Sequence, residues 1–131
     1  MVLGIFGWPV EHSRSPAMHN AALAAVGLDA TYVPFAVRPD ALGRAVEGVR
    51  ALGIRGVNVT LPHKQAIVPL LDELDEAARA IGAVNTVSHE RGRLLGSNTD
   101  APGLVRALEA AGVRAAGARV VVLGAGGAAR A

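Results

Sequence analysis

Residues 56–64 read GVNVTLPHK, a short alternating run that leads into a loop containing a proline. A strand predicted over residues 54–60 points its two valines to one side and Asn58 and Thr60 to the other. Strands of a covered parallel sheet are usually apolar on both faces, so polar side chains near the carboxyl end indicate a ligand crevice beyond the strand ends. A plainer interpretation is that these side chains bond neighbouring backbone groups while Lys64 is solvated, and the strand alone favours neither.

Lys64 is the only lysine in the chain, whereas twelve arginines supply the other side-chain cations. On a solvated surface the two residue types serve equally well, so a single lysine is unexpected. The sequence therefore raises the question whether this position needs a property that arginine lacks.

The apolar pattern on either side of this stretch alternates between strand-like runs and runs with a helical period. Strands are predicted over residues 2–6, 30–37, 54–60, 83–89, 92–98 and 118–123, and helices over residues 15–26, 40–52, 73–81 and 101–111. A tight connection between the strands over 83–89 and 92–98 predicts an antiparallel pair. The order of elements predicts an α/β fold: a mostly parallel open sheet with flanking helices and one antiparallel strand, followed by the first strand of a Rossmann-type domain.

The composition excludes several classes of protein. With 51% hydrophobic and 18% charged residues, the 131-residue chain is expected to be globular and not disordered. The net charge is only +2, the arginines are scattered and aromatic residues make up 3%, so nucleic-acid binding is not expected. No apolar stretch approaches the roughly 18 residues of a membrane span, and the N-terminus lacks the basic leader of a signal peptide.

The chain contains no cysteine, which excludes disulfides, thiolate metal sites and cysteine nucleophiles. The four histidines, at positions 12, 19, 63 and 89, lack metal-ligand spacing. We therefore expect no metal site and interpret the histidines as surface or supporting residues. The absence of cysteine also fits a reducing compartment, and the cytoplasm is the expected location.

The loop EHSRSP (11–16) carries two hydroxyl groups, Ser13 and Ser15, just before a predicted helix. A helix N-terminus presents free N–H groups and a partial positive charge, which suits a carboxylate or a phosphate. Ser15 followed by Pro16 is also a good helix start, with the serine as the capping residue. That interpretation accounts for Ser15 but leaves Ser13 unexplained.

Two further polar positions follow predicted strands or lie at their ends. IGAVNT (81–86) places Asn85 near the end of a strand, and SNTD (97–100) places Asp100 at the start of a helix. Helix capping is the common structural explanation for such an aspartate. An aspartate beside Lys64 would have a second use, which is to hold the lysine ammonium group in place.

Near the C-terminus, GAGGAA (124–129) matches G-x-G-x-x-[GA] directly after the strand predicted over 118–123. The motif alone is weak, but a preceding strand is the context that a dinucleotide phosphate turn requires. The cofactor-binding candidates are Gly124, Ala125, Gly126, Gly127 and Ala128. The remainder of such a unit is absent from the chain, so a complete cofactor site is not expected.

Five motifs occur together in one order and spacing: HSRSP, NVTLPHK, GAVNT, NTD and GAGGAAR. In these motifs, from about residue 3 to its end, the chain resembles the N-terminal portion of shikimate dehydrogenases, a family that includes quinate/shikimate dehydrogenases. The resemblance implies a shikimate-binding catalytic domain over residues 1–100. Residues 101–131 would then be a linker helix and the truncated start of a dinucleotide-binding domain, so the chain alone is expected to be an inactive fragment.

The resemblance also implies an activity: the reversible reduction of 3-dehydroshikimate to shikimate with NADPH, in chorismate and aromatic amino-acid biosynthesis. By motif, Ser13 and Ser15 would hold the substrate carboxylate, and Asn58, Thr60, Asn85 and Asp100 would bind ring hydroxyls. Lys64 would contact the substrate and form the catalytic pair with Asp100, while residues 124–128 would meet the cofactor pyrophosphate. Lysine suits this role because its ammonium group can release a proton, which arginine holds too tightly.

Two alternatives remain open from the sequence. The chain could be a non-catalytic module that binds shikimate, or part of a quinate/shikimate dehydrogenase that uses NAD. The preference for NADP is implied by the resemblance alone. A small-molecule substrate is the expected partner, and either a monomer or a homodimer is compatible with the sequence.

Overall fold

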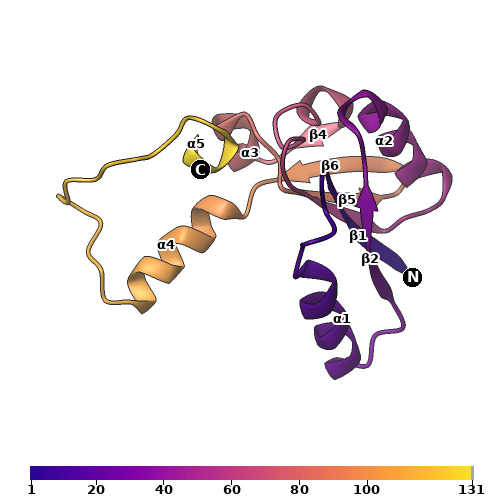
Figure 1. Ribbon diagram of the computed structural model, residues 1–131, viewed down its shortest axis with the longest axis horizontal. Helices are drawn as coiled ribbons and strands as arrows, with labels where there is room; N and C mark the ends of the chain where they lie inside the picture. The colour runs from indigo at the N-terminus through magenta and orange to yellow at the C-terminus, as the bar shows by residue number, and fades with distance from the viewer. Residues whose placement is uncertain (131) are drawn as a thin grey trace.

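The computed structural model describes residues 1–130, apart from the side chains at positions 127 and 128, and is built around one six-stranded sheet (Figure 1). The strands are β1 (Val2–Gly7), β2 (Thr31–Ala36), β3 (Gly56–Val59), β4 (Glu73–Leu74), β5 (Thr86–Glu90) and β6 (Arg93–Ser97), in the spatial order β2-β1-β3-β5-β6-β4. β1 is parallel to β2 and β3, and β6 is parallel to β4, whereas β5 is antiparallel to both of its neighbours. The predicted sheet with one antiparallel strand is therefore confirmed.

Five helices accompany the sheet. They are α1 (Ser15–Ala25), α2 (Leu42–Ala51), α3 (Glu76–Ile81), α4 (Asp100–Ala110) and α5 (Gly127–Arg130), with 3-10 turns η1 (Pro39–Ala41) and η2 (Val68–Leu70). The helix predicted over 73–81 is shorter than expected, because its first two residues pair with β6 as β4. The carboxylate of Asp75 then accepts the N–H of Ala78 at 2.6 Å and starts α3.

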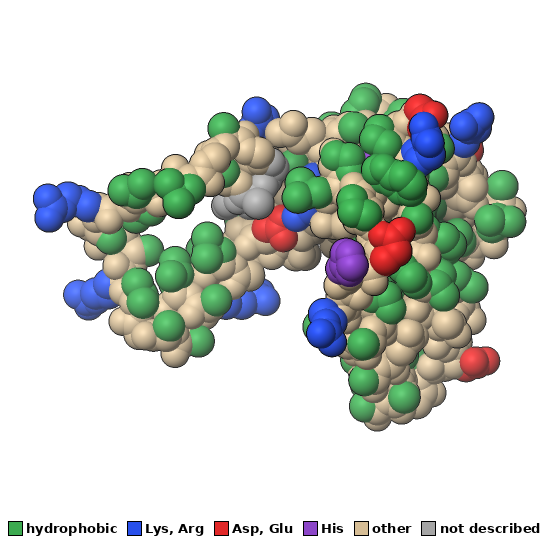
Figure 2. Space-filling view, viewed as in Figure 1, with side chains coloured by type: hydrophobic (Ala, Val, Ile, Leu, Met, Phe, Trp, Pro, Cys, Tyr) green, Lys and Arg blue, Asp and Glu red, His purple; other side chains and the backbone are tan. Residues whose placement is uncertain are grey.

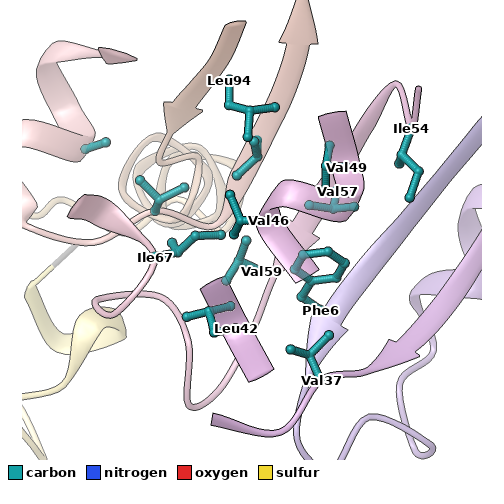
Figure 3. Packing of buried hydrophobic residues seen from close by; sticks show 13 residues of the cluster. Phe6, Val37, Leu42, Val46, Val49, Ile54, Val57, Val59, Ile67 and Leu94 are labelled. Carbon is teal, nitrogen blue, oxygen red and sulfur yellow. The ribbon is translucent and has the colours of Figure 1, made fainter. Parts of the chain in front are cut away.

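The main core lies on one face of the sheet, beneath α2 (Figure 3). Val46 and Val49 of α2 are almost fully buried, and Val57 and Val59 of β3 meet them from the sheet. The predicted alternation of β3 is confirmed, since its two valines enter this core and Asn58 does not. Burying a side chain of this size contributes about 1.5–3 kcal/mol, so the core fixes which way the polar residues of β3 point.

A second, smaller cluster lies around α1. Ile5 and Tyr32 are buried there, and Leu23 of α1 packs against them. The same helix protects the free edge of β2: the side-chain amide of Asn20 donates to the carbonyl of Tyr32 at 2.9 Å and accepts its N–H at 2.8 Å. Pro34, which has no N–H to expose, is accommodated because β2 lies at the edge of the sheet.

The strand predicted over residues 118–123 is wrong: the structure has no strand there, and Val120 to Leu123 are 61–93% exposed. A strand needs neighbouring strands to take its backbone hydrogen bonds, and the described part of the chain offers this segment none. α4, which precedes it, has no buried residue. Figure 1 shows both standing apart from the sheet, and Figure 2 shows hydrophobic side chains exposed along them. No helix in the described range is long and apolar enough to cross a membrane.

Candidate active site

The polar side chains of the predicted site gather at one end of the central strands, where β3 and β6 end and β5 begins. Asn85 directly precedes β5, so it lies at the beginning of a strand. Because β5 runs against its neighbours, this beginning lies beside their carboxyl ends. The carbonyl of Asn85 accepts the N–H of Val59 at 2.8 Å, and its N–H donates to the carbonyl of Ser97 at 3.1 Å. The backbone of Asn85 is therefore held from both sides.

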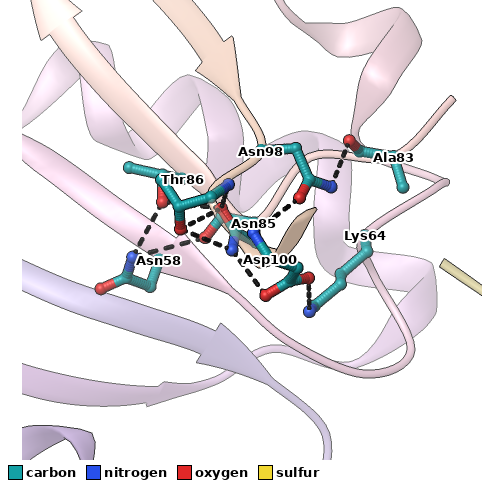
Figure 4. Close-up of polar contacts among 8 residues, drawn as sticks. Asn58, Lys64, Ala83, Asn85, Thr86, Asn98 and Asp100 are labelled. Carbon is teal, nitrogen blue, oxygen red and sulfur yellow. Dashed lines mark hydrogen bonds and ion pairs between the residues drawn. The ribbon is translucent and has the colours of Figure 1, made fainter. Parts of the chain in front are cut away.

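The centre of this group is an ion pair between Lys64 and Asp100 (Figure 4). The Nζ of Lys64 lies 2.6 Å from Oδ2 of Asp100, and the side chains are 16% and 32% exposed. The loop that carries Lys64 is anchored, because its backbone carbonyl accepts the N–H of Val84 at 2.8 Å. The pair is thus held in place by the fold and is still partly open to solvent.

Asp100 does not cap its own helix, contrary to the common explanation for an aspartate at this position. The residue before α4 is Thr99, and no side-chain cap is formed. Oδ1 of Asp100 instead accepts the side-chain amide of Asn85 at 2.8 Å, while Oδ2 faces Lys64. Each carboxylate oxygen of Asp100 is therefore bonded to a different residue of the site, one to Asn85 and the other to Lys64.

Asn98 supplies the contact at the helix start. Its Oδ1 accepts the N–H of Asp100 at 2.9 Å, and its Nδ2 donates to the carbonyl of Ala83 at 2.9 Å. The residue is buried, with only 2% of its surface exposed. The sequence placed Asn98 in the SNTD motif without giving it a role, although an asparagine two residues before a helical aspartate is a recognisable turn signal.

Asn58 joins the same group, together with two residues that sequence reasoning missed. The hydroxyl of Tyr32 donates to Oδ1 of Asn58 at 2.6 Å, and Nδ2 of Asn58 donates to Oγ1 of Thr86 at 3.1 Å. Thr60 is half-buried, and its hydroxyl has no hydrogen-bond partner within residues 1–130. Nothing in the one-dimensional pattern links Tyr32 to a residue 26 positions later.

The two serines lie in the loop between β1 and α1. Oγ of Ser13 accepts the N–H of Ser15 at 3.2 Å, and the residue before α1 is Arg14. The prediction that Ser15 caps this helix is therefore wrong. Ser15 is itself the first helical residue, and its backbone N–H donates to the hydroxyl of Ser13, which lies just before Arg14. Ser13 also lines an open cavity of about 620 Å³ with Glu11, His12 and Arg14.

Ser15 lies close to the Tyr32 phenol. Burial raises the pKa of the Tyr32 phenol to about 12, and an interaction with the Ser15 side chain lowers it by a smaller amount. The structure thus brings Asn58, Lys64, Asn85 and Asp100 into one hydrogen-bonded group. Ser13, Ser15 and Thr60 border the same edge of the sheet without a side-chain bond to that group in the described range.

The predicted phosphate turn precedes α5. Gly124 has a φ of +108°, which favours glycine, and a Cβ placed at Gly124 or Gly126 would have no neighbour within 4 Å. An open glycine backbone of this kind fits the approach of a pyrophosphate. The surroundings of positions 127 and 128, two of the cofactor-binding candidates, lie outside what the structure describes.

His63 and His19 make contacts inside the fold. Nε2 of His63 lies 2.7 Å from the carbonyl of Val37, and this ring is buried, so the expectation of a surface position is wrong for His63. His19 stacks on Tyr32, with 4.3 Å between ring centroids. Within the described residues, no group of three potential metal ligands is present.

A family model described as "Shikimate dehydrogenase substrate binding domain" matches residues 5–87, more than half of the chain. The chain belongs to this family. Among relatives of this shikimate dehydrogenase domain, the shikimate dehydrogenase (NADP(+)) of Geobacter metallireducens is 62% identical over 131 residues, which cover 99% of the chain and 46% of the relative. The chain thus spans under half the length of such curated relatives.

Solved structures agree with the family assignment. Shikimate 5-dehydrogenase from Thermus thermophilus, in complex with NADP(H) and shikimate, is 47% identical with a TM-score of 0.92, covering 99% of this chain and 49% of that one. Ligand-free 5-ketofructose reductase of a Gluconobacter strain is 43% identical with a TM-score of 0.87, covering 98% and 46%. The shikimate dehydrogenase domain fold is therefore shared by proteins named for different substrates.

Proposed function

We propose that the complete protein is an NADPH-dependent shikimate dehydrogenase, which reversibly reduces 3-dehydroshikimate to shikimate, and that this chain is its substrate-binding half. The observation that carries the proposal is the 2.6 Å ion pair between Asp100 and the only lysine of the chain, at the open edge of the sheet. The names and ligands of the relatives support the choice of substrate and cofactor.

Reduction of a ketone leaves negative charge on oxygen, which needs a proton as the charge develops. NADPH, when bound, supplies the hydride to the carbonyl carbon. Nζ of Lys64 donates the proton to the carbonyl oxygen and takes it back in the reverse direction. Asp100 holds the ammonium group and orients a ring hydroxyl. Proton transfer from a positioned side chain contributes about 100- to 10,000-fold in rate.

The remaining substrate contacts are assigned to polar side chains that lie around the ion pair of Lys64 and Asp100. The hydroxyls of Ser13 and Ser15 would bind the substrate carboxylate near the N-terminus of α1, where backbone N–H groups favour an anion. Thr60 has an uncommitted hydroxyl in the described range, which suits a ring hydroxyl, and Asn85 would act beside Asp100, to which its amide donates at 2.8 Å. The residues predicted to bind substrate thus divide into a carboxylate end and a hydroxyl end.

We further propose a boundary near residue 100, with the substrate domain over 1–100 and a linker and the start of the cofactor domain over 101–131. In support, the last buried hydrophobic residue is Leu94, and α4 buries none. The reaction belongs to aromatic amino-acid biosynthesis, and we expect it in the cytoplasm, in keeping with a cysteine-free sequence.

Turnover by the complete protein tests this function. We expect NADPH oxidation that depends on 3-dehydroshikimate; turnover of quinate with NAD but not of shikimate would favour the quinate alternative, and no turnover of either would overturn the proposal. Calorimetric titration of the 131-residue chain with shikimate and with NADP, separately, addresses the binding-module alternative. Binding of shikimate alone would support a module, and binding of neither would indicate an incomplete fragment.

A second candidate is reduction of another small oxygenated ketone, which the relative named 5-ketofructose reductase favours. The two candidate substrates differ in charge: 3-dehydroshikimate carries a carboxylate, whereas a ketose carries none. Replacing Ser13 by Ala should raise the KM for 3-dehydroshikimate, because a hydroxyl bound to the carboxylate is lost. If activity toward an uncharged ketose exceeded activity toward shikimate, the second candidate would replace the first.

A further inference from the structure

An unbroken series of side-chain hydrogen bonds joins Tyr32 to Asp100. The series is made of Tyr32, Asn58, Thr86, Asn85 and Asp100, which we call the Tyr32 network. Its four bonds measure 2.6, 3.1, 2.9 and 2.8 Å, in that order. Figure 4 shows the last four members, with Lys64 bonded to the far oxygen of Asp100.

The donors of the network all point the same way. The pKa of Tyr32 is about 12, so the phenol keeps its proton and donates to Oδ1 of Asn58. That bond turns the amide nitrogen of Asn58 toward Thr86, whose hydroxyl then donates to Oδ1 of Asn85. The amide nitrogen of Asn85 is left facing Asp100. The bond from Tyr32 thus agrees with one orientation of each amide, and the backbone N–H of Thr99 supports the orientation of Asn85 by donating to its Oδ1 at 3.1 Å.

The sheet register makes these contacts possible. Asn58 of β3 and Thr86 of β5 are direct cross-strand partners, so their side chains meet on one face. Tyr32 stands on β2, beyond β1, and its long side chain reaches across to Asn58. Asn20 fixes the Tyr32 backbone, and His19 stacks on its ring. The network is therefore anchored at the end remote from the reacting pair.

Both polar atoms of the Asn58 side chain already have partners within the protein. Its amide nitrogen donates to Oγ1 of Thr86 and, at 3.4 Å, to the carbonyl of Asn85, and its oxygen accepts the short bond from Tyr32. The amide oxygen keeps a second lone pair for a further donor. The bonds that the structure shows nevertheless make Asn58 the connection between Tyr32 and Thr86.

We propose that Tyr32, Asn58 and Thr86 are positioning residues, which hold the Asn85 amide against Asp100 and so keep Asp100 aligned with Lys64. The inference rests on the proposed function for its kinetic consequences. Asn58 is thereby assigned to holding the Asn85 amide in place. Tyr32 and Thr86, for which the sequence predicted no role, are assigned to the same task.

The kinetic experiment uses the complete two-domain enzyme. Thr86→Val keeps the shape of the side chain and removes its hydroxyl, and we expect kcat to fall about fivefold to tenfold while the KM for 3-dehydroshikimate changes less than about twofold. Thr86→Ser, which retains the hydroxyl, should restore most of the lost turnover. Ser88→Ala is the matched control: Ser88 lies on the same face of β5, and its hydroxyl has no partner in the described range.

A double-mutant cycle separates positioning from a merely structural role. If Thr86 acts through Asn85, Thr86→Val should cause no further loss of kcat in an Asn85→Ala background. Tyr32→Phe should lower kcat less than Thr86→Val and should have no additional effect once Thr86 is valine. A loss of the same size in both backgrounds, or an increase in KM without a change in kcat, would overturn the proposal.

A spectroscopic arm keeps the test independent of the substrate. In the complete protein, the side-chain NH₂ resonances of Asn85 should shift or broaden on Tyr32→Phe, although the two residues are not in contact, and should be unaffected by Ser88→Ala. If wild-type enzyme failed to turn over 3-dehydroshikimate, the proposed function would fall while this shift still supported the network. Unchanged Asn85 resonances in Tyr32→Phe would refute the network itself.

Discussion

Lys64 and Asp100 are 36 residues apart in sequence, yet their Nζ and Oδ2 atoms lie 2.6 Å apart. One residue comes from the loop after β3 and the other opens α4, the helix that leads away from the sheet. The contact therefore joins the loop after β3 to the start of α4. Any change in the direction of α4 would act on this pair, to which we assign the proton transfer.

The single tyrosine gives a direct optical measurement of the site. Burial holds the pKa of Tyr32 at about 12, so the native chain should form little tyrosinate near pH 10 to 11. A near-ultraviolet titration of the 131-residue chain should give one transition close to pH 12. Because the folded pKa is raised, stability should be lost as the pH rises above about 10, where the unfolded chain ionises first.

The same titration in denaturant is the control for Tyr32, and it should give the ordinary tyrosine value of about 10. A native transition near pH 10 would mean that the phenol is solvated. It could not then be the fixed donor at the head of the network.

Leu94 should be a determinant of stability. It is fully buried in the main core, and Leu94→Ala should lower the free energy of unfolding by about 2–5 kcal/mol, because a cavity replaces the lost methyl groups. Chemical denaturation measures the change. Leu52, which is 77% exposed, provides the control: Leu52→Ala should change stability by less than about 0.5 kcal/mol. Equal losses of stability in Leu94→Ala and Leu52→Ala would contradict the position of Leu94 in the core.

Asp72 should contribute to stability in a pH-dependent way. The guanidinium of Arg50 at 2.8 Å, and the N–H of Leu94 at 2.6 Å, hold the pKa of this carboxyl below its usual range. A depressed folded pKa stabilises the fold above the unfolded value of about 3.9, and the stabilisation is lost as the pH falls through the folded value. Asp72→Asn should therefore be less stable than wild type at pH 7, with a difference that disappears in strong acid.

Urea unfolding at a series of pH values checks this prediction. Asp29→Asn is a suitable control, because Asp29 is exposed and its side chain makes no hydrogen bond in the part of the chain that the structure describes. A stability difference between wild type and Asp72→Asn that stayed constant from pH 7 to strong acid would contradict an ionic origin.

The sequence predicted the parts of the fold that depend on local pattern. The alternation in β3 correctly predicted that Val57 and Val59 lie on the opposite face from Asn58. Burial of the two valines in the core determines which face of the strand is turned inward. The tight connection between β5 and β6 correctly predicted the antiparallel excursion. Segment 118–123 has an equally strong apolar pattern but forms no strand, since a strand also depends on neighbours that pattern alone does not supply.

The site was predicted where a motif names the residue, and missed where only the fold creates the contact. Lys64 and Asp100 stood out through residue type and position, and they do pair. Tyr32 and Thr86 did not, because a tyrosine and a threonine in strands are ordinary residues whose roles arise from cross-strand register. Asn98 was noticed but left without a role, since its partner, the carbonyl of Ala83, is a backbone group.

The most direct measurement of the central claim is the turnover of the complete enzyme carrying Lys64→Ala and, separately, Lys64→Arg. We predict that kcat falls at least about 100-fold in both, with shikimate affinity changed by only a modest factor, because arginine restores the charge but does not release the proton. Turnover near the wild-type rate in either variant would contradict the assignment of Lys64 as the proton donor.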